Sequence, residues 1–224
     1  HTRLTDVTGV QSVLFRSMGS LCFGEADLES VLDRVSQAQS KIETLRASFV
    51  QEKQSDFFAE NVTSSGVLYY KAPDSIRWEY ESPSKIIILI THETVTFYDV
   101  EQKKAERTVV GRVRKKIQQY MMATEPLEKL KRYFTIYFAE KEKEGRYYLR
   151  LVPAVRKIEK HLSEVNIEVD RELNLPVSVA YTDSDGDLTR YKLHGIVINE
   201  PIDPEKFRLD LPSDVQIQEF RLKP

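Results

Sequence analysis

The sequence has little cysteine and little net charge, and each of these shortages excludes a class of function. The 224 residues include one cysteine, Cys22, so neither an internal disulfide framework nor a cysteine-rich zinc site is possible. The formal net charge is −2, which provides no basic field to attract nucleic acid or an anionic membrane. Nucleic acid is therefore not expected as a partner.

Long apolar runs are also absent. A membrane-spanning helix needs roughly 20 consecutive apolar residues, and no stretch approaches that length. Residues 10–23 are moderately apolar, and Cys22 and Gly24 supply small residues where a signal peptidase reads them, but Arg16 interrupts the run. We interpret residues 1–24 either as an uncleaved export leader or as an N-terminal extension. No linker divides the remainder, so residues 25–224 are predicted to form a single domain.

Catalytic and metal-binding motifs are missing as well. The four histidines (His1, His92, His161 and His194) lie at no metal-ligand spacing from one another. The sequence contains no glycine-rich phosphate loop, no Gly-x-Ser-x-Gly and no His-Glu-x-x-His. The acidic turn at residues 183–187 lacks the spacing and the closing glutamate of a calcium loop. We therefore expect no enzyme activity, no metal and no cofactor.

What the sequence does contain is a series of strand-like segments rich in aromatic residues. The 11 tyrosines and 10 phenylalanines exceed the 8 glycines, which favours strands over a helical bundle. In residues 75–80, Ile76, Trp78 and Tyr80 alternate with polar side chains, as in a strand with one dry face. Short breaks separate consecutive strands, which predicts an antiparallel meander. The strands predicted in this region span residues 66–70, 75–80, 86–90 and 95–98.

Two helical segments are predicted beside these strands. Residues 26–45 carry apolar side chains at spacings of three and four, which gives one apolar stripe for the dry face of a sheet. Residues 117–130 are also helical in pattern, and Pro126 is expected to break them into two short helices that form a mobile lid. The charged stretch at residues 103–116 is interpreted as a solvated loop or an edge and not as a binding patch.

The remaining strand patterns complete the predicted fold class. Further strands are expected at residues 47–52, 133–138, 146–152, 165–169, 176–181 and 188–197. About ten strands with few helices must curl around a core or leave a cavity. An ordinary packed core and a ligand cavity both remain open at this point. A cavity would bind acyl chains at roughly 0.8 kcal/mol per buried methylene, or on the order of 12 kcal/mol for about sixteen carbons. Cargo bound that tightly would not be released. A carrier would therefore need to bury only part of the acyl chain, or to have a lid whose closed state competes with the cargo.

Several motifs, taken in order, resemble one known family. They are Ala47-Ser48-Phe49-x-Gln51, then Gly66-x-Leu68-x-x-Lys71-x-Pro73, then Arg77-Trp78-x-Tyr80 and Phe97-Tyr98-Asp99, and finally Phe207-x-Leu209-x-Leu211-Pro212-x-x-Val215. In this order and spacing the sequence is similar to the periplasmic outer-membrane lipoprotein carrier family (LolA-like) over residues 27–216. The resemblance implies a mainly β, α+β fold: an unclosed antiparallel β-barrel with short helices covering its open, apolar concave side.

The resemblance also implies a function and a set of site residues. Members of the family carry acylated lipoproteins through the periplasm from an inner-membrane ABC transporter to an outer-membrane receptor, and touch the membranes transiently through these partners. The concave face would bind the acyl chains of a lipoprotein or a related lipid. The implied ligand-binding residues are Leu68, Tyr70, Ile76, Trp78, Tyr80, Val95 and Phe97 on the sheet, with Tyr120, Met121, Leu127 and Leu130 on the lid.

Two departures from the family pattern mark this chain as a divergent member. Ala72 stands where well-known carriers have an arginine that helps to hold the lid, so the lid must be held differently. His92-Glu93 replaces the usual Asp-Gly turn. One alternative keeps the fold but makes the protein a lipid sensor or scaffold that regulates a protein partner. A hydrolase is a third alternative, but it would need polar residues inside the cavity, where the implied positions are almost all apolar.

Overall fold

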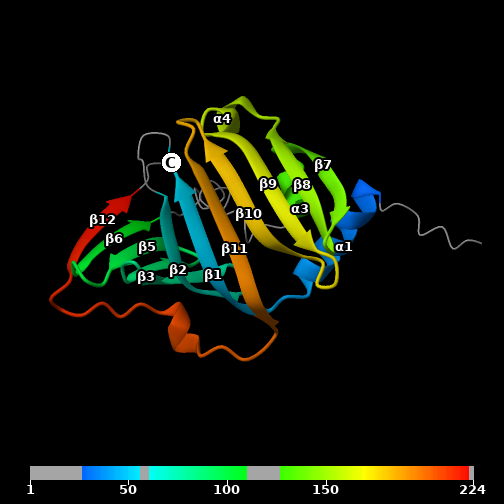
Figure 1. Ribbon diagram of the computed structural model, residues 1–224. Helices are drawn as coiled ribbons and strands as arrows, with labels where there is room; N and C mark the ends of the chain where they lie inside the picture. Colours follow the sequence, from blue (N-terminus) through cyan, green and yellow to red (C-terminus); the bar gives the residue numbers. More distant parts are fainter. Residues whose placement is uncertain (1–26, 56–60, 110–126, 222–224) are drawn as a thin grey trace, which may run out of the picture.

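A computed structural model describes residues 27–55, 61–109 and 127–221 (Figure 1). Within these residues twelve strands form one sheet, in the order β12-β6-β5-β4-β3-β2-β1-β11-β10-β9-β8-β7. The strands are β1 (Thr44–Gln54), β2 (Val62–Lys71), β3 (Ser75–Ser82), β4 (Ile86–Ile90), β5 (Thr94–Asp99), β6 (Lys104–Val109), β7 (Phe134–Lys143), β8 (Arg146–Pro153), β9 (Leu162–Asp170), β10 (Leu175–Asp183), β11 (Leu188–Ile198) and β12 (Gln216–Arg221).

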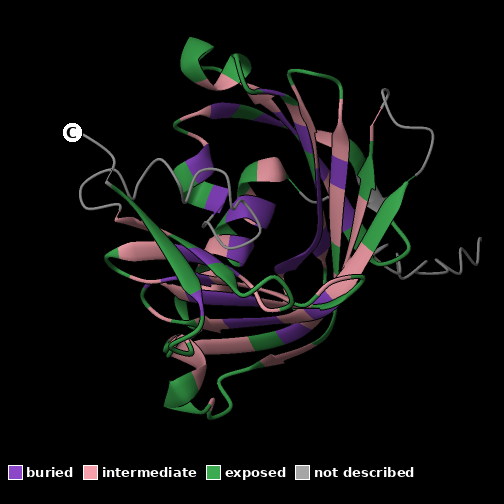
Figure 2. Ribbon diagram, turned by 90° about the vertical axis from the view of Figure 1, so that its left-hand side faces the viewer, coloured by how far each residue is buried: buried purple, intermediate pink, exposed green. Residues whose placement is uncertain are grey.

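The sheet curves into a barrel that does not close. Its two edge strands, β12 and β7, pair only on one side, and the helices at residues 28–40 and 127–130 lie inside the curve (Figure 2). Sequence neighbours pair antiparallel from β1 to β6 and from β7 to β11, and β1 pairs with β11 to join the two runs. The predicted mainly β fold with an unclosed barrel is confirmed. The predicted leader or extension at residues 1–24 lies outside the described residues.

Two strands were not predicted as such. β6 was interpreted as a solvated loop or edge because Lys104, Glu106 and Arg107 give it a charged sequence. It is nevertheless a strand, because β5 and β12 pair with it on either side and provide hydrogen-bond partners for its backbone N–H and C=O groups. β12 pairs with β6 in parallel, so the sheet is not a pure antiparallel meander. The count in the described residues is twelve instead of about ten for this reason.

Helix α1 (Leu28–Ser40) is shorter than the predicted helix at residues 26–45. Val31, Leu32 and Val35 form its apolar stripe and are almost completely buried, each contributing roughly 1.5–3 kcal/mol of transfer free energy. The helix ends because β1 begins at Thr44, whose backbone pairs with β2. Leu45 therefore belongs to the sheet.

The other described helices are short. α3 (Leu127–Leu130) is the last turn of the segment predicted at residues 117–130, whose earlier part lies outside the described residues. It docks beside α1, because the backbone N–H of Leu127 donates to Oε1 of Gln39 at 3.2 Å. α4 (Arg156–Glu159) and the 3-10 helix η2 (Pro204–Phe207) lie elsewhere on the sheet. No helix in the described part of the chain is long and apolar enough to cross a membrane.

Three apolar clusters fill the two sides of the sheet. The first, here called the helix cluster, joins α1 and α3 to β7–β10, where Leu149, Leu151 and Val165 are almost completely buried. A second cluster, which we call the concave cluster, belongs to β1–β5 and β11. Val179 of the helix cluster lies opposite Tyr191 of the concave cluster in the β10–β11 register, so both clusters share the concave face.

The third cluster lies on the convex face. It includes Tyr98, Ala105 and Val215, which pack against Leu209 and Leu211. These last residues belong to residues 201–215, here called the C-terminal strap, which runs across the outside of the sheet from β11 to β12 (Figure 1). The strap covers the convex face at β3, β5 and β6, so we look for a ligand site on the concave face.

Candidate functional site: the concave face of the sheet

The concave cluster contains five buried residues, Phe49, Leu68, Ile76, Trp78 and Ile90. Partly buried apolar residues pack against them: Leu45, Tyr70, Tyr80, Ile88, Val95, Tyr191 and Leu193. Every one of these residues lies on a strand. No residue of a described helix belongs to this cluster, which distinguishes it from the helix cluster.

Strand register explains why these residues meet. Leu68 of β2 lies opposite Trp78 of β3, and Trp78 lies opposite Ile88 of β4. Residues directly opposite one another in an antiparallel sheet share a face. The period-two alternation in β3 therefore places Ile76, Trp78 and Tyr80 together on the concave side, as the sequence predicted.

Six of the predicted ligand-binding residues come together in the concave cluster: Leu68, Tyr70, Ile76, Trp78, Tyr80 and Val95. Phe97 lies on the same face, opposite Ile88, but it sits outside the cluster and is 39% exposed. It therefore forms an accessible apolar position at the side of the concave cluster that is nearer to the β12 edge.

The two predicted lid residues that the structure describes, Leu127 and Leu130, lie outside the concave cluster. Leu127 and Leu130 are completely buried in the helix cluster, beside Val31 and Val35 of α1. Tyr120 and Met121 lie outside the described residues. The structure therefore brings the predicted sheet residues together but places Leu127 and Leu130 in a different cluster.

Aromatic rings form the centre of the concave cluster. Phe49 packs edge to face against Trp78 and against Tyr80, with ring centroids 4.9 Å apart in both pairs. Tyr191 lies 5.2 Å from Trp78 by the same measure. Such rings provide large apolar areas with few rotatable bonds, which suits a surface that binds chains without losing much side-chain entropy.

One polar group of three side chains interrupts this apolar surface. Gln51 Nε2 donates to the hydroxyl of Tyr191 at 2.8 Å, and the hydroxyls of Tyr191 and Tyr80 lie 3.4 Å apart. Burial raises the pKa of Tyr80 and also that of Tyr191, so both hydroxyls stay neutral at physiological pH. We did not predict Gln51 or Tyr191 as site residues. Their positions on adjacent strands, 140 residues apart in sequence, depend on the β1–β11 pairing.

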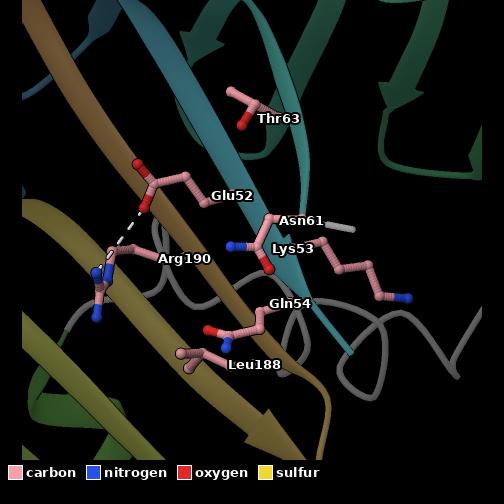
Figure 3. Close-up of a pocket in the computed structure, with 7 residues that line it drawn as sticks. All are labelled: Glu52, Lys53, Gln54, Asn61, Thr63, Leu188 and Arg190. Carbon is pink, nitrogen blue, oxygen red and sulfur yellow. Dashed lines mark ion pairs between the residues drawn. The ribbon is translucent and has the colours of Figure 1, made fainter. Parts of the chain in front are cut away.

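A polar pocket lies at one end of β1, β2 and β11 (Figure 3). Its volume is about 390 Å³, and it is lined by Glu52, Lys53, Gln54, Asn61, Thr63, Leu188 and Arg190. Its charges are paired: Glu52 faces Arg190 at 3.8 Å and Lys192 at 3.1 Å, and Lys53 lies 3.5 Å from Asp187. None of these residues was predicted as part of a site, and the paired charges give the pocket no evident chemistry.

The departures from the family pattern lie at the rim formed by the turns between strands. The backbone N–H of Ala72 donates to the carbonyl oxygen of Glu43 at 2.7 Å. His92, in the β4–β5 turn, lies 3.5 Å from a carboxylate oxygen of Asp74 in the β2–β3 turn.

Among the described residues no group of His, Cys, Asp and Glu is arranged to hold a metal ion.

Comparison with known proteins decides what this architecture is. Residues 40–210 match the family described as outer membrane lipoprotein carrier protein LolA. The chain belongs to the LolA family. An outer-membrane lipoprotein carrier protein of Methylococcus capsulatus is 25% identical over 201 residues, covering 89% of this chain and 93% of that protein.

Solved structures share the LolA-like fold at low sequence identity. An uncharacterized conserved protein from Thermus thermophilus is 13% identical with a TM-score of 0.52, covering 86% of this chain and 98% of that one. MucB is 11% identical with a TM-score of 0.52, covering 84% of this chain and 64% of that one. At these identities the likeness concerns the fold alone.

Proposed function

We propose that this chain is a non-enzymatic periplasmic carrier that binds the acyl chains of lipoproteins, or of a related lipid, on the concave face of its sheet. It would accept this cargo from an inner-membrane ABC transporter and pass it to an outer-membrane receptor. Family membership supports the role. The concave cluster is the observation that carries it, because strands alone supply this apolar surface in the described part of the chain.

The physical basis of binding is apolar burial. Each methylene placed against the concave cluster would contribute roughly 0.8 kcal/mol. Cargo must also be released, so only part of an acyl chain can gain this full amount. Phe97 provides a partly exposed apolar position on the same face, where a chain would remain in contact with water.

The test uses an apolar fluorophore bound to the purified protein and displaced by an acylated lipopeptide. We expect Phe97→Ser to weaken binding of the lipopeptide several-fold, because it removes exposed apolar surface from the concave face. The matched control is Tyr137→Ser: Tyr137 is 51% exposed, but its neighbour Ile136 faces the helix cluster, so Tyr137 faces outward. Equal effects of the two substitutions, or no displaceable binding, would contradict the proposal.

Transfer between membranes distinguishes a carrier from a lipid sensor of the same fold. A carrier should move a labelled lipopeptide from vesicles that hold the transporter to vesicles that hold the receptor. A sensor would instead form a stoichiometric complex with a protein partner that changes when lipid is added, without transfer.

A further inference from the structure

The indole N–H of Trp78 is a buried donor without an acceptor among the residues that the structure describes. Trp78 is 3% exposed, and its Nε1 makes no hydrogen bond to any part of the chain in residues 27–55, 61–109 and 127–221. Buried polar groups are nearly always paired, because an unpaired one loses its hydrogen bond to water and gains nothing in return. An unpaired donor at the centre of a candidate binding surface therefore requires an explanation.

A second donor belongs to the same cluster. The hydroxyl of Tyr191 accepts from Gln51 and shares one hydrogen bond with the hydroxyl of Tyr80. Two hydroxyls carry two protons, and only one proton can lie between the two oxygens. The other has no acceptor in the hydrogen bonds of the described residues. The ring centroids of Trp78 and Tyr191 are 5.2 Å apart, so both donors belong to one region of the concave cluster.

From this excess of donors we propose that Trp78, with the Tyr80–Tyr191 pair, recognises a neutral carbonyl acceptor: the ester or amide group that joins an acyl chain to its carrier molecule. The inference rests on the proposed function, and it adds that the site reads the acyl linkage as well as the hydrocarbon. A hydrocarbon would leave the indole N–H unpaired, whereas a carbonyl oxygen would accept from it.

The surroundings favour a neutral acceptor over a carboxylate. In the strand register Trp78 lies between Leu68 and Ile88, and the neighbouring positions on the same face of the described strands are Tyr70, Ile76, Tyr80 and Ile90, none of which is charged at physiological pH. An anion buried there would lose its hydration without gaining a counter-charge. Burial also raises the pKa of both Tyr80 and Tyr191, as expected where negative charge is disfavoured. Free fatty acids should therefore bind less well than their esters.

Trp78 is the only tryptophan in the sequence, which makes a direct test possible. The full chain, labelled with ¹⁵N, gives a single indole N–H signal in a proton–nitrogen correlation spectrum. We expect the methyl ester of a medium-length fatty acid to move this proton signal downfield, the mark of a new hydrogen bond. An alkane with the same number of heavy atoms should bind without that downfield shift.

Affinities provide the second readout. Removing the indole N–H should weaken ester binding about 3- to 10-fold, which corresponds to one net hydrogen bond, and should leave alkane binding unchanged. Replacing Trp78 by benzothienylalanine keeps two fused rings and substitutes sulfur for N–H, so it should produce this selective loss. Trp78→Phe is a simpler variant with the same expected loss of ester binding relative to alkane binding, and Tyr137→Phe is the control that should change nothing.

The outcomes separate this inference from the proposed function. If neither ester nor alkane binds, the acyl-binding role itself is wrong. If both bind, but the indole signal shows no downfield shift with the ester and loss of the N–H weakens ester and alkane binding equally, the carrier proposal stands and the linkage inference is overturned. An indole proton held against an aromatic ring would keep its upfield position with every ligand, and that result would also overturn it.

Discussion

Arg77 and Glu79 form an ion pair on the convex face of β3, with 2.6 Å between Nε of the arginine and Oε1 of the glutamate. The two side chains are 10% and 19% exposed. Arg77 Nη1 also donates to the carbonyl oxygens of Lys206 and Arg208 in the C-terminal strap, at 3.1 and 3.3 Å. Arg77 therefore helps to fasten the strap to the outside of the sheet, together with the ion pair between Glu79 and Lys206 of the strap.

Loss of that side chain should destabilise the fold. Arg77→Ala removes the hydrogen bonds to the strap and leaves Glu79 with Lys206 as its remaining partner. We expect the free energy of unfolding to fall by about 2–3 kcal/mol, measured by urea denaturation. The control is Arg150→Ala: its ion pair with Glu164 is exposed, so the cost should be under about 1 kcal/mol. Equal costs would show that the contacts of Arg77 with the strap add nothing to stability.

Gly66 should not tolerate a side chain. A Cβ built there would lie 1.9 Å from the carbonyl oxygen of Glu79, so β2 and β3 would have to move apart. We expect Gly66→Ala to destabilise by about 1–3 kcal/mol or more. Gly145 provides the comparison: it has open space but a φ of +73°, so Gly145→Ala should cost about 1–2 kcal/mol through backbone conformation alone. A Gly66→Ala protein with unchanged stability would contradict the β2–β3 register.

Leu130 tests the assignment of α3 to the helix cluster. Because Leu130 is completely buried there, Leu130→Ala should lower the free energy of unfolding by about 2–5 kcal/mol. Below the unfolding transition the variant should bind the apolar fluorophore with nearly unchanged affinity, since Leu130 is absent from the concave cluster. A large loss of affinity in the folded variant would show that α3 takes part in the binding site.

Acid stability should depend on Glu164. Asn166 Nδ2 and Arg150 Nε donate to its carboxylate, and they lower the pKa of Glu164 below its ordinary value. A carboxyl with a lowered folded-state pKa stabilises the fold above its unfolded pKa, and that stabilisation is lost as pH falls through the folded pKa. Glu164→Gln should therefore flatten the decline of the thermal midpoint on the acid side. The effect is small because the carboxylate is partly exposed, and a steeper decline would contradict it.

Sequence patterns captured the parts of the fold that local periodicity determines. The alternation of Ile76, Trp78 and Tyr80 depends only on strand geometry, and the stripe of Val31, Leu32 and Val35 only on helix geometry. The parallel pairing of β12 with β6 has no local signal, since it depends on where the C-terminal strap delivers the chain.

The candidate site was predictable only in part. The part that was predicted again depends on local periodicity. Residues of the β2–β5 meander are close in sequence, so their shared face followed from alternation and short turns. Tyr191 joins them only through the pairing of β1 with β11, which alternation alone cannot assign. The helical pattern around Leu127 predicts an apolar face, but it does not predict which element that face packs against. In the structure that element is α1.

The most direct test of acyl binding on the concave face is quenching of Trp78 fluorescence by a lipopeptide with brominated acyl chains. Bromine quenches indole on contact, and the single tryptophan restricts the signal to this cluster. We expect saturable quenching that an unbrominated lipopeptide reverses by competition. Binding of the lipopeptide without any quenching of Trp78 would place the acyl chains elsewhere and contradict the account.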